Sequence, residues 1–397
     1  MTKTDDIISG FNTYVIQNYA RLPIVIARGE GSRVWDVEGR AYLDLFPGWG
    51  VSAIGYSHPR VVKAVCEQVG RLMHMPNNFY NELQGKLAQA IVERAFPSQC
   101  FFCNSGAEAV EAALKLARLV GAPNGRTEFI TMTGSFHGRT FGAMSATAQE
   151  KYQAQFKPVV PGFHHVPFGD AAAVEVAMSD AVCAVLVEPI QGEGGVNVAP
   201  REYFERLREI CDAAKTLLIF DEVQTGCGRT GHWFGYQYLG VGPDVIVLAK
   251  ALGGGFPIGA IMAKPQYAEA LKPGTHASTY GGSPLACAAA LATIGAIEEE
   301  KLLDNVRRMG EHLRRALEGL VQEFAFVTEA RGAGLMQAIE LAVPGAAVVS
   351  RCLDRGLIVN CTAGSVIRFL PAYTVTAEEL DEGLNILRSV LSEIKAT

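Results

Sequence analysis

The chain lacks the features of nucleic-acid-binding, secreted and membrane-spanning proteins. Charged residues make up only 19% of the sequence, the formal net charge is −6, and no cluster of lysines and arginines could follow a phosphate backbone. No apolar run reaches the roughly 18 residues that a membrane helix needs. Residues 1–6 lack the basic-then-apolar order of a secretory signal. We therefore expect a cytoplasmic protein with small-molecule partners, and neither nucleic acid nor membrane among them.

Cysteine is sparse and scattered. Nine cysteines form an odd set without regular spacing, which argues against a disulfide framework and favours reduced thiols. The CxxC pair, Cys100 and Cys103, lies in an apolar run expected as a strand, where residues three apart point to opposite faces. No set of histidines and cysteines has the spacing of metal ligands, so we expect no metal site.

Apolar residues and glycine are abundant instead. Hydrophobic residues make up 49% of the 397 positions and 42 are glycine, which is typical of a well-buried α/β enzyme. Short apolar runs alternate with longer helical patterns, and this alternation predicts a doubly wound, mainly parallel sheet flanked by helices. The runs expected as strands are residues 100–103, 128–132, 183–187, 217–221 and 245–249.

The pattern changes after about residue 285. Long, charged segments with helical periodicity then flank two strand-like stretches, 325–341 and 357–370. We expect a large domain at residues 51–285 and a smaller α+β domain at residues 286–397. Residues 1–50 contain a hairpin-like segment and are expected to pack on the smaller domain.

Two of the apolar runs lead into ionisable residues, one into an acid and the other into an amine. Residues 217–220 lead into Asp221, and residues 245–249 lead into Lys250. In a parallel sheet both emerge at the carboxyl ends of strands, where open α/β sheets bind their ligands. Pyridoxal phosphate suits both, because its aldehyde condenses with a lysine amine and its ring nitrogen stays protonated beside a carboxylate.

Two short turns are candidates for binding the phosphate of such a cofactor. Ser105, Gly106 and Ala107 follow a candidate strand and open a strong helix-forming segment, so free backbone N–H groups would face an anion. Read alone, this turn is weak evidence, because small residues before a helix usually form just a cap. Thr279 precedes Tyr280 and two glycines in a second hydroxyl-plus-glycine turn, which is either another phosphate contact or an ordinary loop.

Residues 134–140 combine an aromatic ring, an imidazole and a guanidinium. The ring of Phe136 can stack on a flat cofactor, and Arg139 can bind a carboxylate with two hydrogen bonds. Glu193 lies in a glycine-rich loop, whereas Arg368 lies inside an apolar run. An arginine in such a run requires an anionic partner, which is either a structural carboxylate or a substrate.

Two long motifs resemble those of class III pyridoxal-phosphate aminotransferases. They are DEVQTGCGRTG at residues 221–231 and AKALGGGFPIG at residues 249–259. Within that class the chain is similar to acetylornithine aminotransferases, which also read Asn-Ser-Gly before the helix. The resemblance implies the pyridoxal-phosphate transferase fold type I. It also implies transfer of the 5-amine of N2-acetylornithine to 2-oxoglutarate in arginine biosynthesis, giving N-acetylglutamate 5-semialdehyde and glutamate.

The same resemblance implies a role for each site residue. Lys250 would condense with the cofactor aldehyde and act in catalysis with Asp221, the partner of the pyridine nitrogen. The residues expected around the cofactor are Ser105, Gly106, Ala107, Phe136, His137, Val223, Gln224 and Thr279. Thr279 would reach the phosphate of the other subunit, which implies a homodimer. The residues expected to bind substrate are Arg139, Ser278, Glu193 and Arg368, with Glu193 covering Arg368 until 2-oxoglutarate arrives.

Some positions depart from the family pattern and leave the amine donor open. Trp49 stands where a small aliphatic residue is frequent, and Tyr19 resembles a tyrosine that ornithine enzymes use on the free α-amine. Both are candidate substrate-binding residues, although Tyr19 is equally well a packed anchor. Succinylornithine, N-succinyl-diaminopimelate, ornithine and 4-aminobutyrate therefore stay alternative donors. Another pyridoxal-phosphate reaction and a non-catalytic scaffold are the remaining hypotheses.

Overall fold

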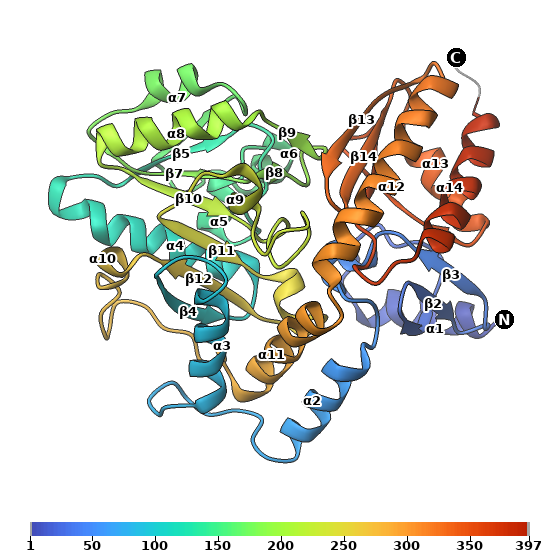
Figure 1. The fold of residues 1–397 in the computed structure, drawn as a ribbon, viewed down its shortest axis with the longest axis horizontal. Coiled ribbons are helices and arrows are strands. Elements are labelled where there is room, and N and C mark those ends of the chain that lie inside the picture. Colours follow the sequence, from blue (N-terminus) through green and yellow to red (C-terminus); the bar gives the residue numbers. More distant parts are fainter. Residues whose placement is uncertain (1, 395–397) are drawn as a thin grey trace.

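The computed structural model describes residues 2–394, and a seven-stranded sheet forms the centre of its larger part (Figure 1). The strand order is β4 (Gln99–Cys103), β12 (Gly259–Ala263), β11 (Val245–Leu248), β10 (Leu217–Asp221), β7 (Val182–Val187), β5 (Glu128–Met132) and β6 (Phe163–Val166). Neighbouring strands are parallel except at β12, which runs antiparallel to β11 and β4. The predicted mainly parallel sheet is confirmed, whereas β6 and β12 were not predicted.

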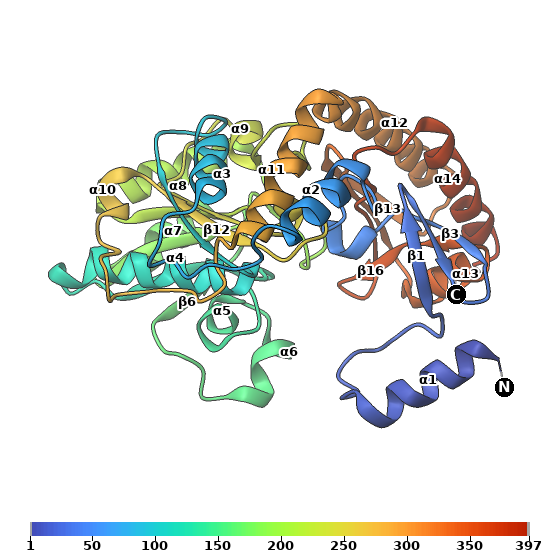
Figure 2. The ribbon, with the colours of Figure 1, turned by 90° about the horizontal axis from the view of Figure 1, so that it is seen from below.

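Helices cover both faces of this sheet, because its buried strands point alternate apolar residues to each side (Figure 2). Phe129 and Ile219 face α4 (Gly106–Gly121), whose alanine-rich side allows close packing. Their neighbours Ile130 and Leu218 face α8 (Arg201–Ala214) on the other side. The remaining helices of the larger part include α2 (Pro59–Val69), α3 (Glu82–Val92), α5 (Phe141–Ala146), α6 (Glu150–Gln153), α7 (Ala171–Ala177), α9 (Gly235–Leu239), α10 (Pro265–Ala268) and α11 (Pro284–Glu299).

Two small sheets form the other part of the molecule. One is antiparallel, in the order β13 (Val327–Ala333), β14 (Met336–Leu341), β17 (Val366–Phe369) and β16 (Asn360–Thr362). The other joins β1 (Ile26–Glu30), β2 (Arg33–Asp36) and β3 (Ala41–Asp44) to β15 (Leu357–Ile358). Helices α12 (Leu302–Glu323), α13 (Ala346–Asp354) and α14 (Ala377–Ser392) complete this part.

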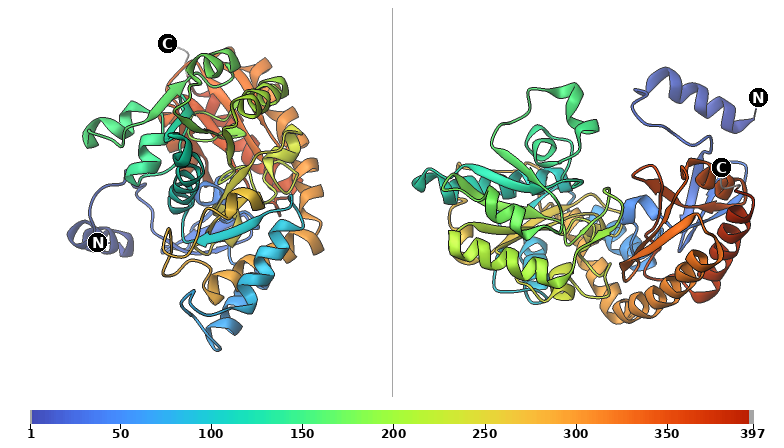
Figure 3. Two further views of the ribbon diagram at one scale, coloured as in Figure 1. Left: turned by 90° about the vertical axis from the view of Figure 1, so that its left-hand side faces the viewer. Right: turned by 90° about the horizontal axis from the view of Figure 1, so that it is seen from above.

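The two ends of the chain share a sheet, since β3 pairs with β15 in parallel. This pairing supports the expectation that the N-terminal hairpin packs against the C-terminal segment. We retain the division into residues 1–50, 51–285 and 286–397 as a proposal. Helix α1 (Lys3–Tyr14) buries none of its residues and stands away from the body of the molecule (Figure 3).

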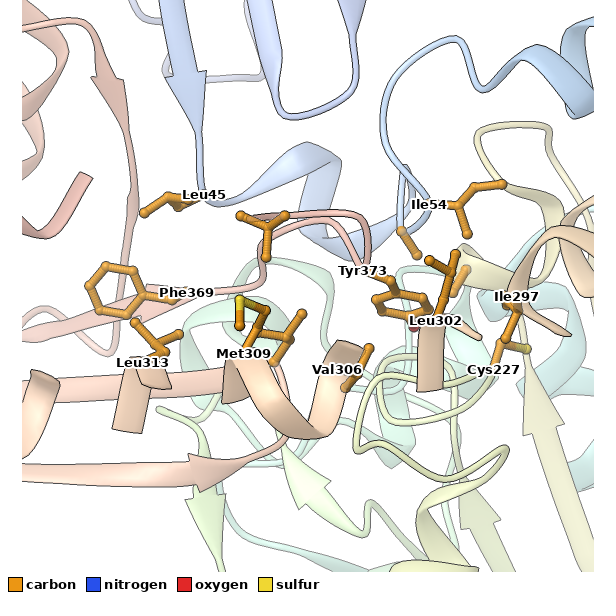
Figure 4. Close-up of a cluster of buried hydrophobic side chains, with 14 of the residues drawn as sticks. Leu45, Ile54, Cys227, Ile297, Leu302, Val306, Met309, Leu313, Phe369 and Tyr373 are labelled. Atoms are coloured by element: carbon orange, nitrogen blue, oxygen red, sulfur yellow. The ribbon is translucent and has the colours of Figure 1, made fainter. Parts of the chain in front are cut away.

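One apolar cluster holds the two parts together. It includes Ile246 of the large sheet, Ile297 of α11, Leu313 of α12 and Phe369 of β17. Figure 4 shows part of this cluster, with Tyr373 packed among side chains from several segments. The position of β17 relative to the large sheet is therefore fixed by a dry core. Among residues 2–394, no helix is both long and apolar enough to cross a lipid bilayer.

Candidate active site

A cavity of about 440 Å³ lies beside the carboxyl ends of the central strands, in the size range of small-molecule sites. Glu188, Asp221 and Lys250 line it, and they stand at or just beyond the ends of β7, β10 and β11. The structure thus brings the predicted lysine and aspartate together at one edge of the sheet. The other predicted residues that line the cavity are Ser105, Gly106, Ala107, Phe136, His137, Arg139, Glu193, Val223 and Gln224.

Lys250 is held in an unusual backbone conformation, with φ of 43°. A non-glycine residue in this left-handed region is strained, and such strain gathers at functional sites. Burial lowers the pKa of Lys250, and this effect exceeds the opposing attraction of Glu193, while Arg368 lowers the pKa further. A larger fraction of the amine is therefore neutral than in a solvent-exposed lysine, which makes it a better nucleophile.

Asp221 is almost fully buried and is oriented from two sides. His137 places Nδ1 2.7 Å from one carboxylate oxygen of Asp221, and the backbone N–H of Val223 donates to the other oxygen at 3.0 Å. Within residues 2–394, Nε2 of His137 has no hydrogen-bond partner. These contacts hold the carboxylate in one orientation at the floor of the cavity.

Glu188 was not predicted as a site residue. Its carboxylate accepts the N–H of Phe136 at 3.0 Å and the N–H of Gly192 at 3.1 Å, so it joins two loops that line the cavity. Burial raises the pKa of Glu188 to about 7. The sequence did contain a signal, because Glu188 follows the apolar strand Val182–Val187 much as Asp221 ends its own strand.

The N-terminus of α4 faces the cavity. Ser105 is the N-cap residue, and its hydroxyl accepts the N–H of Glu108 at 3.2 Å. The N–H groups at the start of the helix, at Gly106 and Ala107, have no acceptor within the helix. A Cβ atom at Gly106 would lie 3.1 Å from a methyl group of Val223, so the helix approaches that side chain closely. This end of α4 is built to receive an anion.

Arg368 and Glu193 form an ion pair, as predicted. Nη1 of the buried Arg368 lies 2.6 Å from Oε1 of Glu193 and 3.3 Å from Oε1 of Gln224. Asn360 accepts two further hydrogen bonds from the guanidinium, and the ring of Phe46 lies beneath it at 4.8 Å. Burial alone would raise the pKa of Glu193, but the positive charge of Arg368 and its hydrogen bond lower it below its ordinary value.

Arg139 presents its guanidinium at the exposed side of the cavity. It lies 4.0 Å from the centre of the Tyr152 ring and 5.5 Å from that of Phe136. These two rings meet edge to face at 5.5 Å. Arg139 forms neither a hydrogen bond to a side chain nor an ion pair within the described chain, so its donors remain available. Tyr152 was not predicted as a site residue, because it lies in a short polar helix, α6.

Four predicted substrate or cofactor residues lie outside this cavity in the single chain. Ser278 and Thr279 line a neighbouring hollow of about 410 Å³, and Asn104 links the two spaces by donating to the Ser278 hydroxyl at 3.2 Å. Tyr19 is 66% exposed. Trp49, with φ of 58°, is half-exposed and packs edge to face on Phe46 at 5.7 Å.

The family follows from comparison with known sequences. A model of the family described as Aminotransferase class-III matches residues 14–391. The chain is a class III aminotransferase. The acetylornithine aminotransferase of Caldanaerobacter subterraneus subsp. tengcongensis is 48% identical over 386 residues, covering 96% of this chain and 98% of that protein. The acetylornithine aminotransferase of Methanocaldococcus jannaschii is 46% identical over 387 residues, covering 96% and 97%.

Solved structures share the fold along almost the whole chain. The ornithine aminotransferase of Toxoplasma gondii ME49 superimposes with a TM-score of 0.94 at 37% identity, covering 99% of this chain and 96% of that one. The acetylornithine aminotransferase of Elizabethkingia anophelis gives a TM-score of 0.88 at 33% identity, covering 99% and 100%. The predicted fold type I is confirmed for this class III aminotransferase.

Class III aminotransferases depend on pyridoxal phosphate, and the residues of the cavity fit this cofactor. The start of α4 offers N–H groups for a phosphate, and Gly106 keeps the approach to Val223 open. Buried Asp221 offers a negative charge to a protonated ring nitrogen, and Lys250 offers an amine with a lowered pKa. These groups would thus suit the phosphate, the ring nitrogen and the aldehyde of one molecule.

Proposed function

We propose that this enzyme transfers the 5-amine of N2-acetylornithine to 2-oxoglutarate, giving N-acetylglutamate 5-semialdehyde and glutamate in arginine biosynthesis. The names of the relatives at 48% and 46% identity support this choice of amine donor. Ornithine is the alternative donor, because an ornithine aminotransferase superimposes with a TM-score of 0.94. Succinylornithine and 4-aminobutyrate are further alternatives within the class.

The ion pair between Glu193 and Arg368 is the observation that carries this proposal. Two different substrates must use one cavity in turn, and only 2-oxoglutarate brings a carboxylate beside its reacting carbon. Glu193 lies 2.6 Å from Arg368 in the structure, and it would neutralise the guanidinium in this way while the amine donor is bound. With 2-oxoglutarate bound, the substrate carboxylate replaces Glu193 on the guanidinium, in the bidentate geometry that arginine favours.

The cofactor, when bound, supplies an electron sink for the carbon that exchanges its amine. Ser105, Gly106 and Ala107 would hold its phosphate, and Thr279 of the other subunit would add a hydroxyl. Asp221, oriented by His137, would keep a proton on the ring nitrogen. The residues proposed to enclose the ring are Phe136, Val223 and Gln224, with Gln224 contacting the ring hydroxyl.

Lys250 moves the proton at the reacting carbon. When it is not bound to the cofactor, Nζ of Lys250 would be a free amine in a buried site that lowers its pKa. It can therefore take a proton from the substrate carbon that bears the amine and return one during the same half-reaction. The opposite transfer, with 2-oxoglutarate as substrate, uses the same atom in reverse.

Arg139 is proposed to bind the α-carboxylate of the amine donor, with Ser278 as a second contact. Its guanidinium lies on the Tyr152 ring with its donors available. Trp49 and Tyr19 are proposed to influence the choice of amine donor at the mouth of the site. Trp49 does so through Phe46, which supports both its ring and the guanidinium of Arg368.

We also propose that the active form is a cytoplasmic homodimer. Residues 72–80 pack on residues 278–282, because Asn77 donates to the Ser278 and Gly281 carbonyls at 3.2 and 2.9 Å. Both segments expose large apolar side chains: Leu72, Met73, Phe79, Tyr80 and Tyr280. A second copy of the chain would cover this surface and would bring Thr279 toward the partner's phosphate.

A steady-state assay tests the reaction. The cofactor-loaded enzyme is supplied with each candidate amine and 2-oxoglutarate, and glutamate is measured. N2-acetylornithine should give the highest kcat/KM, and Arg368→Gln should raise the KM for 2-oxoglutarate by about tenfold or more, since hydrogen bonds to charged groups contribute about 1.5–3 kcal/mol. A higher kcat/KM for ornithine would contradict the choice of donor and leave the family assignment intact.

A further inference from the structure

Arg229 and Arg368 are both fully buried arginines, and the proposed reaction gives a role only to Arg368. Only 1% of the surface of Arg229 is exposed, and no carboxylate among residues 2–394 pairs with it. Nη1 of Arg229 instead donates to two backbone carbonyls, that of Pro371 at 2.6 Å and that of Leu335 at 3.0 Å. Its Cζ lies 4.6 Å from the centre of the Tyr373 ring, which Figure 4 shows in the core between the two parts. A buried guanidinium without an acid is costly, so its retention requires a reason.

The two carbonyls lie just beyond the adjoining ends of two neighbouring strands of the small sheet, Leu335 before β14 and Pro371 after β17. In the antiparallel pairing of β14 with β17, Gln337 is opposite Phe369. Pairs of the same hydrogen-bonding type recur every two residues, so the same register places Leu335 opposite Pro371. Proline has no N–H, so Pro371 cannot donate to the Leu335 carbonyl. Arg229 supplies the missing donor to Leu335 and accepts in return, because the Leu335 N–H lies 3.1 Å from the Arg229 carbonyl. A residue of the larger part therefore completes the strand pairing of the smaller part.

This contact fixes the strand that carries Arg368. Arg368 lies three positions before Pro371, on β17. Arg229 belongs to the segment that follows β10, which ends at Asp221, and this segment also carries Gln224. The guanidinium of Arg229 thus sets the distance between the floor of the cavity and the guanidinium that receives the substrate carboxylate.

We propose that Arg229 is a positioning residue for recognition of the keto-acid carboxylate, acting through β17 and Arg368. The inference rests on the proposed role of Arg368 in binding 2-oxoglutarate. Arg229 touches neither the cavity nor Glu193, so its effect passes through the backbone at Leu335 and Pro371. Loss of this donor lets the end of β17 shift, and a small displacement of Arg368 is enough to weaken a bidentate contact.

The two half-reactions distinguish positioning from general support. The amine donor reacts while Glu193 covers Arg368, so this half-reaction does not depend on where Arg368 lies. The keto acid needs the guanidinium in place. Loss of Arg229 should therefore impair the half-reaction with 2-oxoglutarate and spare the one with the amine donor. A residue that only holds the fold together would reduce both in proportion to the fraction of folded enzyme.

The test compares Arg229→Leu and Arg229→Lys with wild type in separate single-turnover measurements of each half-reaction. We expect Arg229→Leu to raise the apparent dissociation constant for 2-oxoglutarate by about ten- to a hundredfold. We expect the apparent dissociation constant and the rate constant for N2-acetylornithine to change by less than about threefold. The absorbance of the bound cofactor should stay as in wild type. Arg229→Lys keeps a donor for one of the carbonyls and should give an intermediate value. It also keeps the test decisive if Arg229→Leu does not fold.

Arg307 provides a matched control. It reaches from α12 to the Gly231 carbonyl, in the same segment as Arg229, and its other side-chain hydrogen bond among residues 2–394 is to Asp304, so none of its hydrogen bonds reaches β14 or β17. Arg307→Leu should leave the dissociation constant for 2-oxoglutarate within about twofold of wild type.

Arg368→Gln separates the proposed role of Arg229 from the proposed function. If Arg368→Gln weakens 2-oxoglutarate but Arg229→Leu and Arg229→Lys do not, the positioning role is wrong and the proposed function stands. If Arg368→Gln has no effect, the role of Arg368 is wrong and this inference fails with it.

Discussion

At the scale of single residues, the burial of Lys250 makes its amine more reactive but lowers the stability of the cofactor-free protein. Burial lowers its pKa from the ordinary value of 10.5, so the unfolded chain binds the proton more tightly than the folded, cofactor-free protein does. Stability of the cofactor-free protein therefore rises with pH between the lowered pKa and about 10.5, and the full cost is present below that window. The strained φ of 43° adds to this cost.

Replacing Lys250 by methionine should remove the cost. We expect Lys250→Met to abolish turnover and the absorbance of lysine-bound cofactor, and to raise the Tm of the cofactor-free protein at pH 7 by several degrees. This advantage should shrink as the pH approaches 10.5, because the wild-type amine then loses its proton in both states. Thermal unfolding followed across this pH range checks the prediction, and an advantage that grows with pH would contradict it.

Tyr152 provides a second test at this scale. Its ring supports the Arg139 guanidinium at 4.0 Å, and an exposed cation–π contact is worth roughly 0.5–1 kcal/mol. Tyr152→Leu should raise the KM for N2-acetylornithine about two- to fivefold with kcat nearly unchanged. Tyr152→Phe keeps the ring and should behave as wild type. Equal KM values for the leucine and phenylalanine variants in steady-state assays would exclude the supporting role.

At the scale of elements, the start of α4 combines a helix cap with close packing. A Cβ at position 106 would lie 3.1 Å from a Val223 methyl group, so Gly106→Ala must move a wall of the cofactor site. Overpacking of this kind costs about 1–3 kcal/mol, and we expect cofactor affinity to fall roughly tenfold. Gly85→Ala is the control, because Gly85 lies in α3 with open space around it. Equilibrium titration of the cofactor should separate the two variants.

The sequence predicted elements where one simple pattern dominated. β4, β5, β7, β10 and β11 are apolar runs, and they lie where they were expected. β6 and β12 were not predicted, because one contains two adjacent histidines and the other reads as a run of small residues after a glycine-rich turn. Their strand structure comes from pairing with β5 and with β11 and β4, which a local pattern does not reveal.

The same limit applies to the site. Lys250, Asp221 and the start of α4 follow directly from strand ends and a helix start. The contact of Arg368 with Glu193 was expected only from the family resemblance, since the two residues are far apart in the chain and meet across the two parts of the molecule. Phe46 and Tyr152 were not predicted, because aromatic residues at such positions usually serve packing alone.

At the scale of the whole molecule, the site depends on how its parts are assembled. The cofactor residues come from the larger part, and Arg368 comes from the smaller one, with a shared apolar core between them. The proposed dimer adds Thr279 of a second chain. If assembly supplies this contact, as we propose, cofactor retention should depend on protein concentration.

A charge placed on the exposed apolar surface tests the dimer. Tyr80 is fully exposed in the single chain, and Tyr80→Asp should weaken self-association and reduce cofactor affinity together. Val176→Asp is the matched control, because Val176 is 88% exposed on α7, on the outer side of the large sheet. Sedimentation and cofactor titration measure both effects. Loss of cofactor affinity in a Tyr80→Asp protein that still dimerises would argue against a shared phosphate site.

The most direct measurement mixes the cofactor-loaded enzyme with one amine at a time, without any keto acid, and follows the absorbance of the lysine-bound cofactor. The proposed function predicts rapid loss of this absorbance with N2-acetylornithine and much slower loss with ornithine and 4-aminobutyrate. Recovery of the signal on addition of 2-oxoglutarate should follow. Faster reaction with ornithine would contradict the proposed donor, and no reaction with any of these amines would contradict aminotransfer from a terminal amine.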